Sequence, residues 1–187
     1  MCGILFTNDP EIERDSFLKA LDEINHRGPD APGGYGSSGN NQLGHNRLKI
    51  IDIDDRSNQP FTSSNGYYDI IFNGEIYNFK EIKKELSAKN IFFKSNTDTE
   101  VILESYKYWG IDFIKRLRGM FAFAMWDLKK RKLILARDPF GIKPLYFSKK
   151  NGICYFASQV KSLLSINDID ASYSDAGLVG YYLWGNI

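Results

Sequence analysis

The run MFAFAM at residues 120–125 constrains the fold more than any other part of this sequence. Large and small apolar residues alternate along it, and no polar side chain interrupts them. A strand with one face in water alternates apolar and polar residues, so this run predicts a strand that is covered on both faces. The chain therefore has to place a layer on each side of this strand.

Strand and turn residues surround this run on both sides. Apolar and β-branched residues predict strands at 2–7, 42–51, 67–73, 132–138, 144–148 and 153–157. Turn residues separate the last three, at Asp138-Pro139 and Asn151-Gly152. Residues 32–41 hold four glycines and two serines, which predicts a mobile loop rather than a strand or helix.

Helical spacing of apolar residues predicts helices at about 13–25, after Asn78, from Thr97 to Trp109 with a stop at Gly110, and after Ser174. Asn78 with Glu81, and Thr97 with Glu100, have the spacing of capping pairs. Hairpin-spaced strands and grouped helices together predict an α+β fold, in which antiparallel sheets are covered by helices on their outer faces.

Composition excludes several classes of protein. A hydrophobic content of 43% over 187 residues supports a sizeable core, and a net charge of +1 without a basic, aromatic-rich run argues against nucleic acid as a partner. We find no run long enough to cross a membrane and no signal peptide, so we expect a cytoplasmic protein. The two Cys and two His are widely scattered, which predicts no metal site, and Cys154 is expected in a buried strand without a disulfide.

Met1-Cys2-Gly3 carries the strongest chemical signal. Removal of Met1 would leave Cys2 with a thiol nucleophile and a free α-amine, whose pKa of about 8 lets it take the thiol proton. A form that keeps Met1 is therefore expected to be inactive with its pocket intact. The alternative is that Cys2 is a small apolar residue at the start of a buried strand.

Five further motifs follow Cys2 in a fixed order. They are HRGPD at 26–30, GHNRL at 44–48, NGEIYN at 73–78, TDTE at 97–100 and RDPFGIKP at 137–144. Together these motifs resemble the N-terminal glutaminase domain of the class II glutamine amidotransferases, within the N-terminal nucleophile (Ntn) hydrolases, and most of all that of glutamine-hydrolysing asparagine synthetase. The resemblance covers nearly the whole chain. It implies an αββα sandwich of Ntn-hydrolase type and hydrolysis of the glutamine side-chain amide to glutamate and ammonia.

The resemblance implies catalytic roles for three residues. Cys2 attacks the amide carbon to give a γ-glutamyl thioester, while the Asn73 side chain and the Gly74 N–H stabilise the oxyanion. Asn73-Gly74 alone would also be typical of a β-turn after the strand at 67–72. His26 and His45 are expected to be structural, since the α-amine serves as the base.

The resemblance also implies how L-glutamine is recognised. Arg47 would bind the α-carboxylate, and Asp98 the α-ammonium with Glu75 as a second acceptor. Asp98 alone would also suit a capping role at a helix start. The backbone of Arg47, Leu48, Lys49, Ile50 and Ile51 is expected to line the same pocket. Arg27 and Asp30 are expected to pin the loop after the first helix, and the glycine-rich residues 33–39 are a candidate lid over glutamine.

The predicted domains are a glutamine amidotransferase domain at 1–170 and the start of a truncated C-terminal synthetase domain, or a linker, at 171–187. Leu178, Tyr181, Tyr182 and Trp184 would form an apolar face on this last helix; the alternative is that it docks back on its own core. No GxxxxGK phosphate loop occurs, so ATP and Mg are expected in the missing synthetase domain and no cofactor in this one. A homodimer is left open.

Other functions remain open at this stage. Gln159 stands where the resemblance leads us to expect Glu, which keeps a sugar or cell-surface polymer as an alternative ammonia acceptor to aspartate. A self-processing amidohydrolase of the same fold would need a propeptide, whereas only Met1 precedes Cys2. A catalytically silent glutamine-binding module would have the same pocket and no turnover.

Overall fold

The computed structural model describes all residues except 167–168, 171, 173 and 186–187, and the side chain of Trp184. The described strands form two antiparallel sheets, as predicted. One sheet has the order β2-β3-β1-β9-β8, with bounds Ala31–Ser38, Asn41–Arg47, Gly3–Thr7, Ile153–Ala157 and Tyr146–Lys150. The other has the order β4-β5-β6-β7, with bounds Phe61–Thr62, Tyr68–Ile76, Gly119–Asp127 and Lys132–Arg137.

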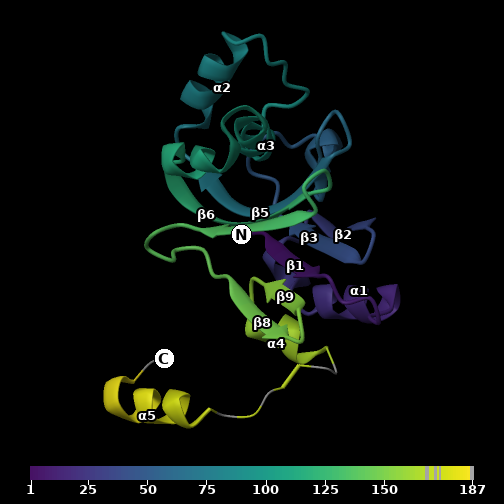
Figure 1. The fold of residues 1–187 in the computed structure, drawn as a ribbon, viewed down its shortest axis with the longest axis vertical. Coiled ribbons are helices and arrows are strands. Elements are labelled where there is room, and N and C mark those ends of the chain that lie inside the picture. Colours follow the sequence, from purple (N-terminus) through teal and green to yellow (C-terminus); the bar gives the residue numbers. More distant parts are fainter. Residues whose placement is uncertain (167–168, 171, 173, 186–187) are drawn as a thin grey trace.

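Helices cover the outer face of each sheet (Figure 1). Helices α1 and α4 lie against the five-stranded sheet, and α2 and α3 lie beyond the four-stranded sheet; α5 stands apart from both. Their bounds are Arg14–Asp22, Val160–Leu164, Phe79–Ser87, Asp98–Trp109 and Asp175–Trp184, with 3-10 turns at Asn25–Arg27, Asp55–Ser57 and Gly110–Arg116. The predicted α+β sandwich is confirmed.

The alternation in β6 divides its side chains between two layers. Ala122 and Ala124 pack in the layer between the sheets, whereas Phe121, Phe123 and Met125 pack in the layer under α3. Small residues therefore face the other sheet and let it approach, and large residues fill the space below the helix. The prediction of a strand covered on both faces is confirmed.

Most of the glycine-rich segment at 32–41 is strand β2, Ala31–Ser38, so its prediction as a mobile loop was wrong. Strand β2 pairs with β3, with an irregularity between Ala31 and Gly34. A Cβ at Gly34 would lie 2.1 Å from the Gln59 carbonyl oxygen, so close backbone packing requires glycine there. The prediction of a lid over bound ligand at 33–39 fails with the loop, because pairing with β3 holds this segment in place.

Two smaller predictions also need correction. Strand β3 ends at Arg47 rather than at residue 51. Asn78 does not cap α2 with its side chain; it donates to the Arg116 carbonyl at 2.9 Å and accepts from the Arg118 N–H at 2.9 Å, which ties the start of α2 to the segment before β6. The Thr97 cap of α3 is confirmed, with Oγ1 3.2 Å from the Glu100 nitrogen.

Ser174 caps the start of α5 as predicted, its hydroxyl accepting from the Gly177 N–H at 3.0 Å. Tyr182 and Leu183 are exposed on this helix, and the expected contribution of the Trp184 side chain lies outside the described residues. Residue 171, where the second predicted domain begins, also lies outside the described residues. The division into 1–170 and 171–187 stays a prediction, while the alternative of a helix docked on its own core does not fit its position apart from both sheets in Figure 1.

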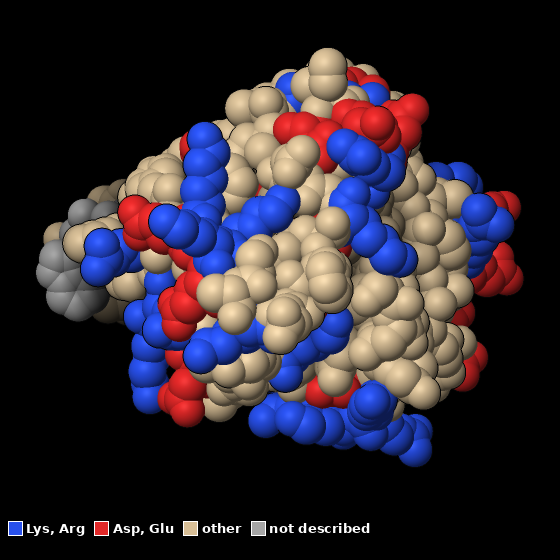
Figure 2. Space-filling model, turned by 90° about the horizontal axis from the view of Figure 1, so that it is seen from above, with Lys and Arg blue, Asp and Glu red and all other residues tan. Residues whose placement is uncertain are grey.

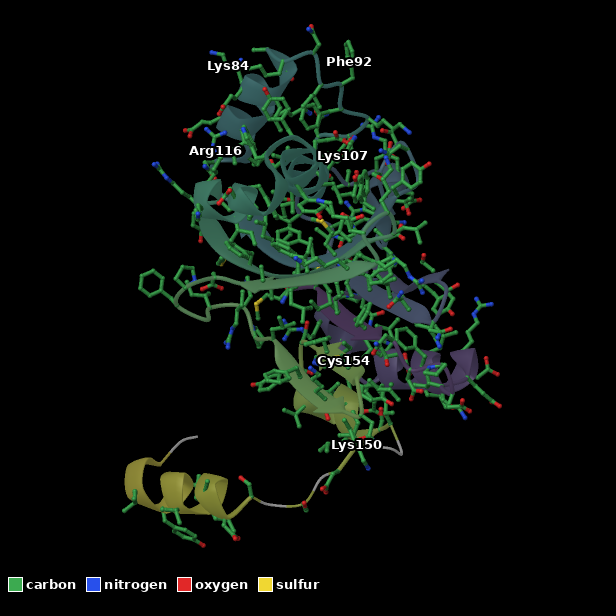
Figure 3. The ribbon with its side chains drawn as sticks, viewed as in Figure 1. Lys84, Phe92, Lys107, Arg116, Lys150 and Cys154 are labelled. Atoms are coloured by element: carbon green, nitrogen blue, oxygen red, sulfur yellow. The ribbon has the colours of Figure 1, made fainter. Side chains whose placement is uncertain are left out.

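Basic and acidic side chains are interspersed over the end of the molecule that carries α2 and α3 (Figure 2). No helix in the described part of the chain is long and apolar enough to span a membrane. Both cysteines are free thiols; Cys154 lies on β9 (Figure 3) and is half-buried rather than fully buried.

Candidate active site

Strand β1 presents Cys2 at the end of the five-stranded sheet. Gly3 is the first residue of β1 to pair, opposite Asn46 of β3, so Cys2 lies just beyond the paired strand. The Cys2 thiol sulfur accepts from the Leu48 N–H at 3.4 Å, and the Cys2 carbonyl accepts from the Arg27 Nε–H at 3.0 Å. The nucleophile predicted from the sequence is thus held at its carbonyl and at its sulfur.

Cys2 opens into a cavity of about 90 Å³ that is partly open to solvent. The cavity lies between the end of β1, the loop after β3, strand β5 and the start of α3. Its lining residues are Met1, Cys2, Arg47, Leu48, Ile50, Ile51, Ser57, Gln59, Phe72, Asn73, Gly74, Glu75, Thr97, Asp98, Thr99, Met120 and Lys143. The structure brings together every predicted site residue except Lys49, whose Nζ is 2.7 Å from Asp55 Oδ1 instead.

Strand β5 carries Asn73 and Gly74 along an edge that β4 leaves uncovered. β4 pairs with β5 only at Ile70 and Asp69, so the later part of β5 has β6 on one side and no strand on the other. The Phe72 N–H donates to Gln59 Oε1 at 2.6 Å and the Ile76 N–H to Asp98 Oδ2 at 3.0 Å. N–H groups alternate in direction along a strand, so the Gly74 N–H also points away from β6, toward the uncovered edge.

The Asn73 side chain faces the layer between the sheets, where Ile71 two residues earlier also packs. Its Nδ2 is buried and has no hydrogen-bond partner among the described residues. Such orphaned buried donors are rare in native proteins. A Cβ at Gly74 would lie 2.3 Å from the Met120 carbonyl, so glycine is required where β5 packs on β6. Both residues lie within a strand, and the alternative of a β-turn was wrong.

Asp98 faces the cavity from the first turn of α3. Thr97 fills the cap position, and Asp98 is the first residue of α3, at the positive end of the helix, where its Oδ2 also accepts the Ile76 N–H at 3.0 Å. Burial raises the pKa of Asp98 to about 6, although the N–H groups of Ile76 and Thr99 oppose the rise. Burial also raises the pKa of Cys2, while the Leu48 N–H, the chain's α-amine and Arg47 favour the thiolate.

Arg47 organises the loop that follows β3. Its Nη1 donates to the Asp54 carbonyl at 3.0 Å and to Asn58 Oδ1 at 2.8 Å, and its Nη2 donates to the carbonyls of Ile51 and Asp52. These four bonds use every N–H of the guanidinium except that at Nε. Binding of a carboxylate by Arg47 would therefore use Nε or exchange a loop carbonyl, and this role stays a prediction.

Several contacts around the cavity join residues in ways that were not predicted from the sequence. Arg27 and Asp30 tie the segment after the first helix to other parts of the chain, as expected, but their partners were not predicted. Arg27 donates to the Cys2 carbonyl, and Asp30 accepts the Lys49 N–H at 2.8 Å. Lys143 lines the cavity although it carries a charge and is buried. Its position in RDPFGIKP was the available signal, since Asp138 of that motif accepts the Lys143 N–H at 3.0 Å. Gln59 gave no signal in the sequence pattern.

Comparison with known proteins gives a family for the chain. A family model described as "glutamine amidotransferase domain" matches residues 1–187. The chain belongs to this family.

The curated relatives of this glutamine amidotransferase domain are longer proteins. It is 42% identical over 177 residues to "Asparagine synthetase [glutamine-hydrolyzing] 1" of Bacillus subtilis, covering 91% of the chain and 28% of the relative. It is 39% identical over 179 residues to "Amidase chry2" of Gibberella zeae, covering 88% of the chain and 26% of the relative. The chain thus spans less than a third of the length of these relatives. The domain is homologous to the glutaminase domains of asparagine synthetases.

Solved structures agree with the fold of this glutamine amidotransferase domain. The glutamine phosphoribosylpyrophosphate amidotransferase of B. subtilis, in complex with ADP and GMP, matches with a TM-score of 0.72. The match covers 88% of this chain and 43% of that one at 19% identity, which bears on the fold alone.

Proposed function

We propose that this chain hydrolyses the side-chain amide of L-glutamine to glutamate and ammonia. The observation that carries the proposal is the pair of hydrogen-bond donors on β5. Asn73 Nδ2 lacks a partner in the described part of the chain, the Gly74 N–H points to the uncovered edge, and both residues line the cavity that holds the Cys2 thiol. Donors held ready in this way are what a developing oxyanion requires.

The chemistry follows from groups at the start of the chain. Removal of Met1 frees the α-amine of Cys2, which takes the thiol proton as the sulfur attacks the amide carbon. The carbonyl electrons move to oxygen, where Asn73 and Gly74 stabilise them by about 3 to 4 kcal/mol for each donor. The ammonium returns its proton to the leaving nitrogen, ammonia departs, and water hydrolyses the resulting γ-glutamyl thioester. Burial raises the pKa of the thiol, so a neighbouring base is needed.

Recognition of the amino-acid end of glutamine is proposed for other residues that line the same cavity. Asp98 accepts the α-ammonium with Glu75, and the 47–51 segment with Arg47 receives the α-carboxylate. Asp98 is bonded to the Ile76 N–H, so it is fixed relative to Gly74, two residues earlier on the same strand. This connection holds the two ends of glutamine at a set distance from the nucleophile.

We propose that the ammonia passes to a synthetase domain outside this chain, which uses ATP and Mg to make asparagine from aspartate. The name and length of the B. subtilis relative support this, as does the exposed apolar surface of α5. A sugar or cell-surface polymer is the second candidate acceptor. Gln159 keeps this alternative open, because it stands where the resemblance leads us to expect Glu.

Turnover by the purified chain tests the proposal. Intact mass first establishes that Met1 has been removed, and release of glutamate and ammonia from glutamine is then compared with that of Cys2→Ala. Equal amounts of both products, lost in Cys2→Ala, are the expected result. A chain without Met1 that binds glutamine calorimetrically but releases no ammonia would overturn the enzymatic proposal and favour a glutamine-binding module.

A further inference from the structure

His45 crosses the layer between the two sheets. It lies on β3 two residues after Leu43, which packs in this layer, and its side chain is fully buried. Its Nε2 is 3.1 Å from the Phe72 carbonyl oxygen on β5. That oxygen can only accept, so Nε2 carries the proton, and Nδ1 is left buried without a partner in the described structure. Burial lowers the pKa of His45 to about 3, so the ring is neutral.

Two side chains bind the backbone of Phe72, one at its carbonyl and one at its N–H. His45 binds its carbonyl, and Gln59 Oε1 accepts its N–H at 2.6 Å. Gln59 is in turn bonded to Thr99 Oγ1 at 3.3 Å. These two side chains occupy the edge of β5 that β4 leaves uncovered, immediately before Asn73. They fix the backbone from which the Asn73 side chain and the Gly74 N–H project.

We propose that His45 is a positioning residue for the oxyanion donors, acting through the Phe72 carbonyl and taking no part in proton transfer. The inference rests on the proposed glutaminase function and adds to it a residue outside the cavity lining. The unpartnered Nδ1 of His45 costs stability, and a leucine in this apolar layer would avoid that cost. The hydrogen bond from Nε2 to the Phe72 carbonyl is what an imidazole offers here and a leucine does not. Donors contribute to catalysis only when held near their productive geometry, which gives this bond a catalytic consequence.

A matched pair of variants isolates the hydrogen bond. The side-chain amide of His45→Gln reaches about as far as the imidazole Nε2 and can donate to the Phe72 carbonyl, whereas His45→Met has the same length and shape without a donor. Loss of donor positioning is expected to lower kcat for glutamine about 10- to 100-fold in His45→Met, with KM within about threefold. His45→Gln is expected to stay within about threefold of the native kcat.

Two further measurements separate positioning from a general structural role. Glutamate γ-semialdehyde forms a thiohemiacetal, in which the sulfur bonds to the aldehyde carbon and the oxygen takes the thiol proton. Its affinity should fall in His45→Met by the same factor as kcat, because its oxygen occupies the oxyanion position. The pH profile of kcat/KM should not move, because His45 is neutral throughout the assay range.

A folded His45→Met with native kcat would overturn the inference, as would equal losses in the Gln and Met variants or a shifted pH profile. If thermal melting shows that His45→Met is unfolded, His45→Asn replaces it; its amide stops short of the Phe72 carbonyl, and the same loss in kcat is expected. A native chain that neither hydrolyses glutamine nor binds the aldehyde would contradict the proposed function itself, and the inference would fall with it.

Discussion

The two ends of β1 have opposite polar environments. At the Thr7 end, the Thr7 hydroxyl accepts the Asp9 N–H, Asp9 accepts the Glu11 N–H, and the Tyr155 hydroxyl donates to Asp9. At the Cys2 end, buried nitrogens of Asn73, His45 and Arg27 lack partners within the described residues. Both ends belong to the same strand of the same sheet.

Satisfied polar groups stabilise the fold, whereas unsatisfied polar groups reduce stability and are retained where they serve function. This comparison predicts that changes at the Cys2 end alter activity with little loss of stability. Changes at the Thr7 end should do the reverse.

Cys2→Ala gives the largest expected effect. Without the thiol no thioester forms, so glutamine hydrolysis should fall below detection while binding of glutamine persists. The midpoint of thermal unfolding should change little, because the hydrogen bonds of the sulfur to described residues are long ones, both to Leu48. Steady-state ammonia release and calorimetry check both statements. Ammonia release that survives in Cys2→Ala would assign catalysis to another residue.

Asn73→Ala comes second. Loss of one oxyanion donor is expected to lower kcat about 100- to 1,000-fold, with KM for glutamine within a few-fold of native. Its Nδ2 bonds to no described residue, so the free energy of unfolding should not fall by what a lost hydrogen bond usually costs. Kinetics and urea unfolding are the measurements. A large loss of stability with unchanged kcat would mean that Asn73 stabilises the fold and does not serve catalysis, the opposite of what is expected at the Cys2 end of β1.

Asp98 predicts a pH dependence of substrate affinity. Its pKa of about 6 means that acidification through pH 6 protonates the carboxylate and removes the partner of the α-ammonium. KM for glutamine should therefore rise about tenfold per pH unit below 6. Asp98→Asn should have a raised KM for glutamine at pH 7, and this KM should not rise further as the pH falls through 6. The test is to measure KM for both proteins from pH 5 to 8. A native KM in Asp98→Asn would contradict the proposal that Asp98 binds the α-ammonium of glutamine.

The stability effect of Asp98 has the opposite sign to that of most carboxylates. The pKa is higher in the folded than in the unfolded chain, so the folded state binds the proton more tightly. The contribution of Asp98 to stability therefore falls as pH rises from about 4 to about 6. Asp98→Asn should be at least as stable as the native chain at pH 7, measured by urea unfolding. If Asp98→Asn is less stable than the native chain at pH 7, the interactions of the ionised carboxylate must stabilise the fold by more than its burial costs.

Tyr155→Phe has the smallest expected effect on activity and tests the other end of β1. It removes a donor from buried Asp9, and the free energy of unfolding should fall by about 1 to 3 kcal/mol. The kcat for glutamine should remain native at 25 °C. Thermal melting and the ammonia assay measure the two quantities. A change in kcat would show that the Thr7 end is coupled to the site.

The sequence predicted features that are recorded in local patterns. MFAFAM predicted the doubly covered strand because burial on both faces leaves no polar residue, and Cys2, Asn73 and Gly74 stood in ordered motifs. Strand β2 was missed because its glycines offer no side-chain alternation to recognise. The bonds of Arg27 to Cys2 and of Asp98 to Ile76 were missed for another reason. They join residues far apart in the chain, and only the packed sheets bring them within reach.

The central claim is that Cys2 forms a thioester at the unsatisfied end of β1. Rapid acid quench of the chain without Met1 during turnover of glutamine, followed by intact mass and peptide mapping, tests it most directly. A γ-glutamyl adduct on Cys2 that forms and decays at rates consistent with turnover, and that is missing in Cys2→Ala, is the predicted result. Full glutamine turnover without any adduct on Cys2, at quench times that span the reaction, would contradict it.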